Sequence, residues 1–131
     1  MQAFLYFDLT APGNYRYKQP LLEQVKTAMP QAAILDMDAQ SGELVQHYAL
    51  KLLHEAAQAV VCIKADESIT DISSLMPILE ELFLERPGRL VLLQGQHARL
   101  QRMFDARISI KYKVAAAEEV VQQVQSFFQD G

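Results

Sequence analysis

The stretch "AVVCIKA" (59–65) decides the fold, because it is apolar at almost every position. A strand with one face in water alternates apolar and polar residues, whereas a strand of a parallel sheet is covered on both faces and is apolar throughout. Two further runs share this pattern, "AFLYFDL" (3–9) and "RLVLLQG" (89–95). The three runs therefore predict the central strands of a parallel sheet.

Two more runs complete the predicted sheet, "AAILDMD" (32–38) and "RISIKYKVA" (107–115). The last run alternates, with apolar residues at Ile108, Ile110, Tyr112 and Val114. One side of this strand should therefore meet water, and its lysines should discourage pairing with the edge of another chain.

Between the runs the apolar residues recur at the period of a helix. The first such stripe is Leu21, Leu22, Val25, Ala28 and Met29, and the last is Val120, Val121, Val124, Phe127 and Phe128. A third helix should begin near 71–74 and end before Pro87, and a short fourth one should cover 96–106. Alternating strands and helices predict an α/β fold with right-handed crossovers. We expect one domain over 1–131, a three-layer αβα sandwich whose five-stranded parallel sheet has the flavodoxin-like order 2-1-3-4-5.

Composition places the chain among ordinary globular proteins, with 50% hydrophobic and 21% charged residues in 131. The single Cys62 lies inside an apolar run, which predicts a buried thiol of raised pKa and a reducing compartment. No run approaches the roughly 20 apolar residues of a membrane span, and the start lacks the pattern of a signal peptide. We expect a soluble, cytoplasmic domain with no membrane contact.

Charge is distributed unevenly along the chain. The segment 86–113 holds seven of the twelve Lys and Arg residues and one acid, so it carries +6 while the rest carries −10. It either forms a face that attracts anions or consists of solvated helix and strand positions. Since this segment lacks the pattern of a recognition helix or of a single-strand platform and the overall charge is negative, nucleic acid is not predicted as a partner.

Ligands of open α/β sheets bind outside the carboxyl ends of the strands. This rule selects the loops 8–19, 36–42, 64–74 and 94–97. The candidate ligand-binding residues are Asp8, Thr10, Asn14, Arg16, Asp38, Lys64, Ser68, His97 and Arg99. The candidates for acid or base chemistry are Glu67, Glu80 and Glu81. A small anionic or nucleotide ligand would suit this set, and no cofactor or metal is predicted.

The loop "TAPGNY" (10–15) resembles the phosphate loop of flavodoxins, in which hydroxyl residues flank a Gly-Asn pair. Pro12 and Tyr15 stand at the family's other hydroxyl positions, and no glycine-rich nucleotide motif occurs. The alternatives are a plain connection into a helix that starts at Pro20, or a partner-contact patch. That patch would consist of Tyr15, Arg16 and Tyr17.

A longer stretch, from Asp38 to about Gln96, resembles the Toll/interleukin-receptor family. It begins "DAQSGELVQHYALKLLHEAAQAVVCIKADES", with an Asp, a loop, an amphipathic helix and a buried strand in the family's order. The resemblance implies that Glu80 or Glu81 could split nicotinamide from NAD. Met76 and Pro77 replace the family's usual Trp and Cys, and Ser41 replaces a proline. The structural alternative places both glutamates on a solvated helix face beside Arg86.

Other acids and histidines favour structural roles. A phosphoacceptor domain would carry a pair of acids after its first strand and an Asp after its third. This chain has the single Asp8 and then Lys64 at those places, so phosphorelay is not predicted. Asp38 or Ser41 is expected to form a turn or cap a helix, although an acid there can also bind a ribose hydroxyl. His97 is expected to be an ordinary surface histidine.

Two functions follow, and the sequence leaves open whether the protein is an enzyme. The first is a non-catalytic interaction or regulatory domain, with a protein partner or self-association. It rests on a second helix with more apolar residues than one sheet contact needs, namely Leu44, Val45, Tyr48, Ala49, Leu52, Leu53 and Ala56. The alternative is a binder or hydrolase of a nucleotide-type or NAD-type ligand at the carboxyl ends of the strands.

Overall fold

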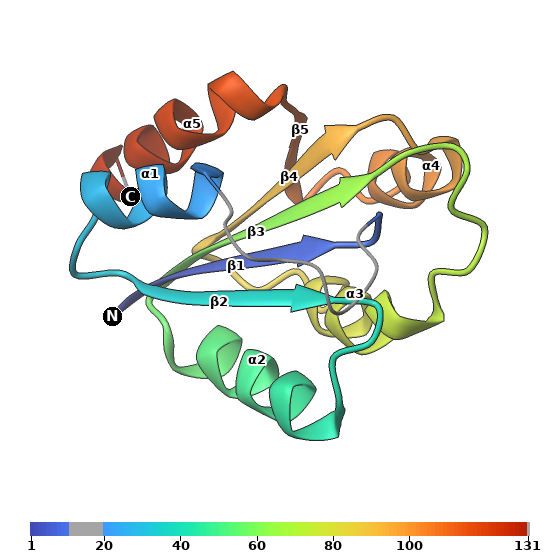
Figure 1. The fold of residues 1–131 in the computed structure, drawn as a ribbon, viewed down its shortest axis with the longest axis horizontal. Helices are drawn as coiled ribbons and strands as arrows, with labels where there is room; N and C mark the ends of the chain where they lie inside the picture. Colours follow the sequence, from blue (N-terminus) through green and yellow to red (C-terminus); the bar gives the residue numbers. More distant parts are fainter. Residues whose placement is uncertain (11–19, 131) are drawn as a thin grey trace.

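A computed structural model describes residues 1–10 and 20–130 and contains a five-stranded parallel sheet (Figure 1). The strands are β1 (Gln2–Asp8), β2 (Ala33–Asp38), β3 (Gln58–Ala65), β4 (Arg89–Gly95) and β5 (Lys111–Val114). Their order is β2-β1-β3-β4-β5, and every neighbouring pair is parallel. The flavodoxin-like α/β fold predicted from the apolar runs is therefore confirmed.

Helices cover both faces of the sheet and form the outer layers. One face carries α1 (Pro20–Ala28) and α5 (Ala117–Asp130), which pack side by side (Figure 1). The other carries α2 (Glu43–Glu55), α3 (Met76–Leu82) and α4 (Ala98–Asp105), with a short 3-10 turn, η1 (Ser73–Leu75), leading into α3. The predicted stripes face the sheet, since Leu21, Val25, Val120, Val124 and Phe128 are all buried.

Alternation along the strands divides the core into two clusters. Phe4, Val60 and Leu92 pack beneath α1 and α5, whereas Leu5 and Val61 pack beneath α2, α3 and α4. Because side chains alternate between the faces, every central strand must be apolar at even and odd positions alike. This explains the continuous runs.

The edge strand β5 differs from its prediction in two ways. It is shorter than the predicted range 107–115, and buried and exposed side chains alternate less regularly along it. Ile108 lies in the turn before it and is 95% exposed, and Val114 is also exposed. The turn is closed by the bond from Ile110 N to Arg107 O at 3.1 Å. The Arg107 guanidinium lies 3.8 Å from the centre of the Phe83 ring and holds the turn against α3. These local contacts replace the strand pairing that alternation alone predicts.

The structure also answers the question of membrane spans for the residues it describes. None of their helices combines the length and the apolar character that crossing a bilayer requires.

Candidate functional site

The carboxyl ends of four strands bring polar side chains together. Asp8 of β1 lies beside Asp38 of β2 and Lys64 of β3, and Lys64 lies beside Gln94 of β4. By alternation, all four belong to the face covered by α1 and α5. The Tyr6 hydroxyl, on the same face, donates to Gln94 Oε1 at 3.2 Å. Three candidate ligand-binding residues, Asp8, Asp38 and Lys64, therefore lie close to Gln94 at the carboxyl edge of the sheet.

Both acids at this edge organise turns. Asp8 Oδ1 accepts bonds from the backbone N of Thr10 at 2.8 Å and from its hydroxyl at 2.6 Å. Asp38 Oδ1 accepts from Gln40 N at 2.8 Å, and the Ser41 hydroxyl accepts from Asp38 N at 3.0 Å. These bonds confirm the prediction of turn formation. Neither Asp38 nor Ser41 takes the alternative role of a helix cap, because the N-terminal cap of α2 is Gly42.

Cys62 of β3 pairs with Tyr6 of β1, two residues before Asp8, and lies on the same face of the sheet as Asp8. Its side chain is completely buried. Burial, together with the smaller effect of the negative charge of Asp8, raises the pKa of the thiol to about 12. A thiol of this pKa stays protonated near neutral pH and is a poor nucleophile. The expectation of a buried thiol is confirmed.

His97 is buried, at 4% exposure, so the expectation of a surface histidine is wrong. Its Nε2 lies 2.6 Å from Ile69 O, and its Nδ1 accepts from Leu100 N at 3.2 Å. This pattern assigns the neutral tautomer with the proton on Nε2, because Nδ1 serves as an acceptor. His97 therefore caps α4 and fastens it to the loop after β3.

Glu67 ties the same two segments together. Its Oε1 accepts from Ala98 N at 2.8 Å, in the first turn of α4. Close by in the loop, the Asp66 carboxylate accepts bonds from the backbone N and hydroxyl of Ser68, which hold the pKa of Asp66 below its ordinary value. Arg99 is exposed on α4. Glu67 and Ser68 thus shape the loop through contacts within the protein.

The loop connection provides a test of His97. We expect His97→Ala to lower the free energy of unfolding by about 1–3 kcal/mol, because α4 loses its cap and Ile69 loses a donor. His97→Asn should lose less, since asparagine can still cap α4. Urea unfolding followed by circular dichroism measures both changes. The exposed neighbour Arg99→Ala is the control, expected within about 0.5 kcal/mol of wild type, and equal losses in His97→Ala and Arg99→Ala would contradict the role assigned to His97.

The glutamates proposed for acid or base chemistry are not brought together. Glu80 is exposed on α3, whereas Glu81 is only 8% exposed, so the expectation of a solvated Glu81 is wrong. Glu81 Oε2 lies 2.8 Å from Arg89 Nη2, and Glu81 Oε1 lies 3.1 Å from His54 Nε2. Arg89 stands at the start of β4, the opposite end of the strand from Gln94. Glu81 therefore lies at the amino-terminal edge of the sheet, away from the candidate ligand-binding residues.

Arg89 is itself buried, although solvated positions were one interpretation of the basic segment. Its guanidinium also donates to the carbonyl oxygens of Glu81 and Leu53, each at 3.1 Å. These bonds join the ends of α2 and α3 to the first residue of β4. Of the other candidate residues, Asn14 and Arg16 lie outside the described residues, as do Pro12, Tyr15 and Tyr17.

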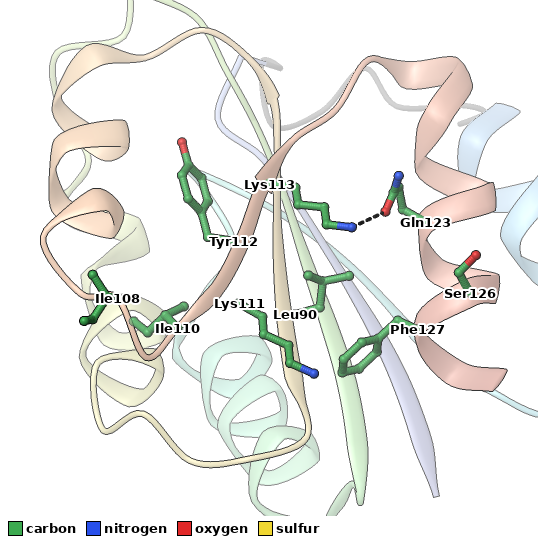
Figure 2. Close-up of a pocket in the computed structure, with 9 residues that line it drawn as sticks. All are labelled: Leu90, Ile108, Ile110, Lys111, Tyr112, Lys113, Gln123, Ser126 and Phe127. Atoms are coloured by element: carbon green, nitrogen blue, oxygen red, sulfur yellow. Dashed lines mark hydrogen bonds between the residues drawn. The ribbon is translucent and has the colours of Figure 1, made fainter. Parts of the chain in front are cut away.

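A second concave region lies between β5 and α5. It is a groove of about 550 Å³, lined by Leu90, Ile108, Ile110, Lys111, Tyr112, Lys113, Gln123, Ser126 and Phe127 (Figure 2). Lys111 and Lys113 point toward α5, where Lys113 Nζ donates to Gln123 Oε1 at 3.1 Å and Lys111 Nζ lies 5.6 Å from the centre of the Phe127 ring. Sequence reasoning missed this groove, because Phe127 and Lys111 meet only when α5 packs beside the sheet.

The fold defines the chain as a flavodoxin-like α/β protein. Comparison with known protein families, curated sequences and solved structures found no match.

Proposed function

We propose that this protein is a non-catalytic interaction domain that binds another protein through the groove between β5 and α5. The observation that carries the proposal is the groove's composition, in which apolar Leu90 and Phe127 lie beside two exposed lysines at an open sheet edge. Protein interfaces combine an apolar centre with a polar rim in this way.

The carboxyl edge supports a catalytic or anion-binding role less well. Its acids Asp8, Asp38, Asp66 and Glu67 already accept hydrogen bonds from backbone N–H groups of the same loops and of α4. These bonds give the carboxylates a structural role in holding the loops and the start of α4. The nucleotide-type alternative remains testable by thermal shift with NAD, FMN, nucleotides and cyclic nucleotides, since a ligand at 100 times its Kd stabilises by about 2.7 kcal/mol. A shift with one of them would favour that alternative.

A smaller apolar surface supports a second candidate function, self-association. On α2, Leu44 and Tyr48 are exposed and lie one turn apart, whereas Ala49, Leu52 and Leu53 are buried against the sheet. Sedimentation at micromolar concentration, with Leu44→Glu/Tyr48→Glu as the comparison, tests whether copies associate through this helix. If the wild type and the variant are both monomeric, the partner is a different protein.

The proposed location is the cytoplasm, supported by the lone buried Cys62.

Photo-crosslinking inside the cell tests the groove directly. A benzophenone amino acid at Ile108, on the groove wall, should give a discrete adduct of higher mass, and the substitution Lys111→Glu/Lys113→Glu should remove it. The same amino acid at Gln24, exposed on α1, is the matched control and should give none. Absence of an adduct from position 108, or equal adducts from both positions, would overturn the proposal.

A further inference from the structure

The outer edge of β5 is open. In the described part of the chain, β5 pairs with β4 alone and is the last strand of the sheet. In a parallel pair, about half of a strand's backbone N–H and C=O groups point away from its partner. An edge of this kind is a template on which an extended chain can add a further strand.

The two faces of β5 differ in chemistry. Lys111 and Lys113 are two residues apart and share the face toward α5 (Figure 2). Ile110, Tyr112 and Val114 alternate with them on the opposite face, where the Tyr112 ring stacks on Phe104 at 5.1 Å. A strand added to β5 would therefore meet cations on one face and apolar side chains on the other.

Among the described residues, no acidic side chain neutralises the lysines within the groove. None lines the groove, and neither lysine forms an ion pair. Lys113 donates to the neutral amide of Gln123, and Lys111 lies over the Phe127 ring. Carboxylates would therefore be the favourable neighbours for both ammonium groups.

The same lysines oppose two other occupants. A second copy that pairs edge to edge through β5 would bring four lysines together, and like charges directly opposite one another destabilise a sheet. A nucleic acid would meet a protein of net charge −4, and the Phe127 ring, which lines the groove beside the lysines, already lies beneath Lys111. An acidic peptide of another protein satisfies both the charge and the open edge.

We propose that an acidic segment of another protein binds in extended conformation along the outer edge of β5, with carboxylates at alternate positions that face Lys111 and Lys113. The intervening apolar side chains pack toward Ile110, Tyr112 and Val114. The proposal rests on the interaction function assigned above and adds the chemistry and the conformation of the partner. It predicts a sequence pattern of alternating acidic and apolar residues.

The test uses three short fluorescent peptides and measures binding by anisotropy and by amide chemical-shift changes. One peptide alternates Glu and Val, the second has the same composition with Glu and Val in separate blocks, and the third alternates Lys and Val. The first should bind at least about tenfold more tightly than the second, because only alternation places carboxylates over both lysines. Shift changes should centre on Lys111–Val114 and Phe127.

Charge reversal supplies the matched variants. Lys111→Glu/Lys113→Glu should lose the Glu-Val peptide and gain the Lys-Val peptide, a gain that an unfolded variant could not show. Lys26→Glu/Lys51→Glu makes the same charge change at exposed positions on α1 and α2 and should still bind the Glu-Val peptide.

Three results would overturn the inference. These are equal binding of the alternating and block peptides, tighter binding of a single-stranded RNA oligonucleotide at the same residues, and no shift changes in β5. If cross-links from Ile108 persist while the Glu-Val peptide fails, the interaction function stands and only the acidic extended partner is wrong. If the cross-links are absent as well, the interaction function itself falls.

Discussion

Replacing Arg89 with methionine is expected to lower the free energy of unfolding by about 3–5 kcal/mol, because removing one partner of a buried ion pair leaves the other charge uncompensated. The Glu81 carboxylate would lose its 2.8 Å contact, and the carbonyl oxygens of Glu81 and Leu53 would lose their donors. Chemical denaturation followed by circular dichroism measures the loss. For a protein of ordinary stability, a change of this size removes a large share of the total.

Two further variants separate the ion pair from other effects. Arg86 Nε lies 3.6 Å from the same carboxylate but its side chain is half-exposed, so Arg86→Met should cost no more than about 1 kcal/mol. Arg89→Met/Glu81→Met should recover part of the loss, because no lone charge remains buried, while the backbone carbonyl oxygens at positions 53 and 81 still lack a donor. If Arg89→Met and Arg86→Met cost the same, burial does not control the strength of this cluster.

Replacing Gly95 with alanine is the second large change and should lower the free energy of unfolding by about 2 kcal/mol or more. Gly95 has a φ of 101°, a conformation that disfavours side chains, and an added Cβ would clash with the carbonyl oxygen of Ala65 on the neighbouring strand. Because the carbonyl oxygen belongs to the backbone and the Cβ is bonded directly to Cα, neither atom can rotate away, and the clash is relieved only if the ends of β3 and β4 separate. Thermal and urea unfolding measure the effect.

Gly42 is the matched control for this substitution. It has a φ of −79°, and an added Cβ would meet nothing within 4 Å. Gly42→Ser should change stability by no more than about 0.5 kcal/mol, since serine is well suited to the N-terminal cap. A Gly95→Ala variant as stable as Gly42→Ser would show that the ends of β3 and β4 can move apart at little cost.

The architecture could be predicted from local pattern alone. The run 89–95 matches β4 at both ends, and the helical stripes at Leu21 and Val120 pack where their spacing directs them. These predictions succeed because burial on both faces requires continuous apolar residues, and burial on one side of a helix requires a stripe.

The polar candidates were less predictable. The sequence predicts Glu81 and His97 as surface residues, because no residue near them in the sequence indicates their partners. Arg89 is eight residues from Glu81, and Ile69 is 28 residues from His97. Polar groups become buried only where the fold supplies a partner, so their environment depends on contacts that form after the layers assemble.

The sequence by itself determined the parallel sheet, its three layers and the edge at which polar side chains gather, because apolar periodicity follows directly from which faces exclude water. Only the tertiary structure decided that Glu81 and Arg89 are buried partners, that His97 caps α4, and that Lys111, Lys113 and Phe127 border one groove. Those relations join residues from different elements, and the free energy of a charge or a hydrogen bond depends on the partner and the exclusion of water that packing brings.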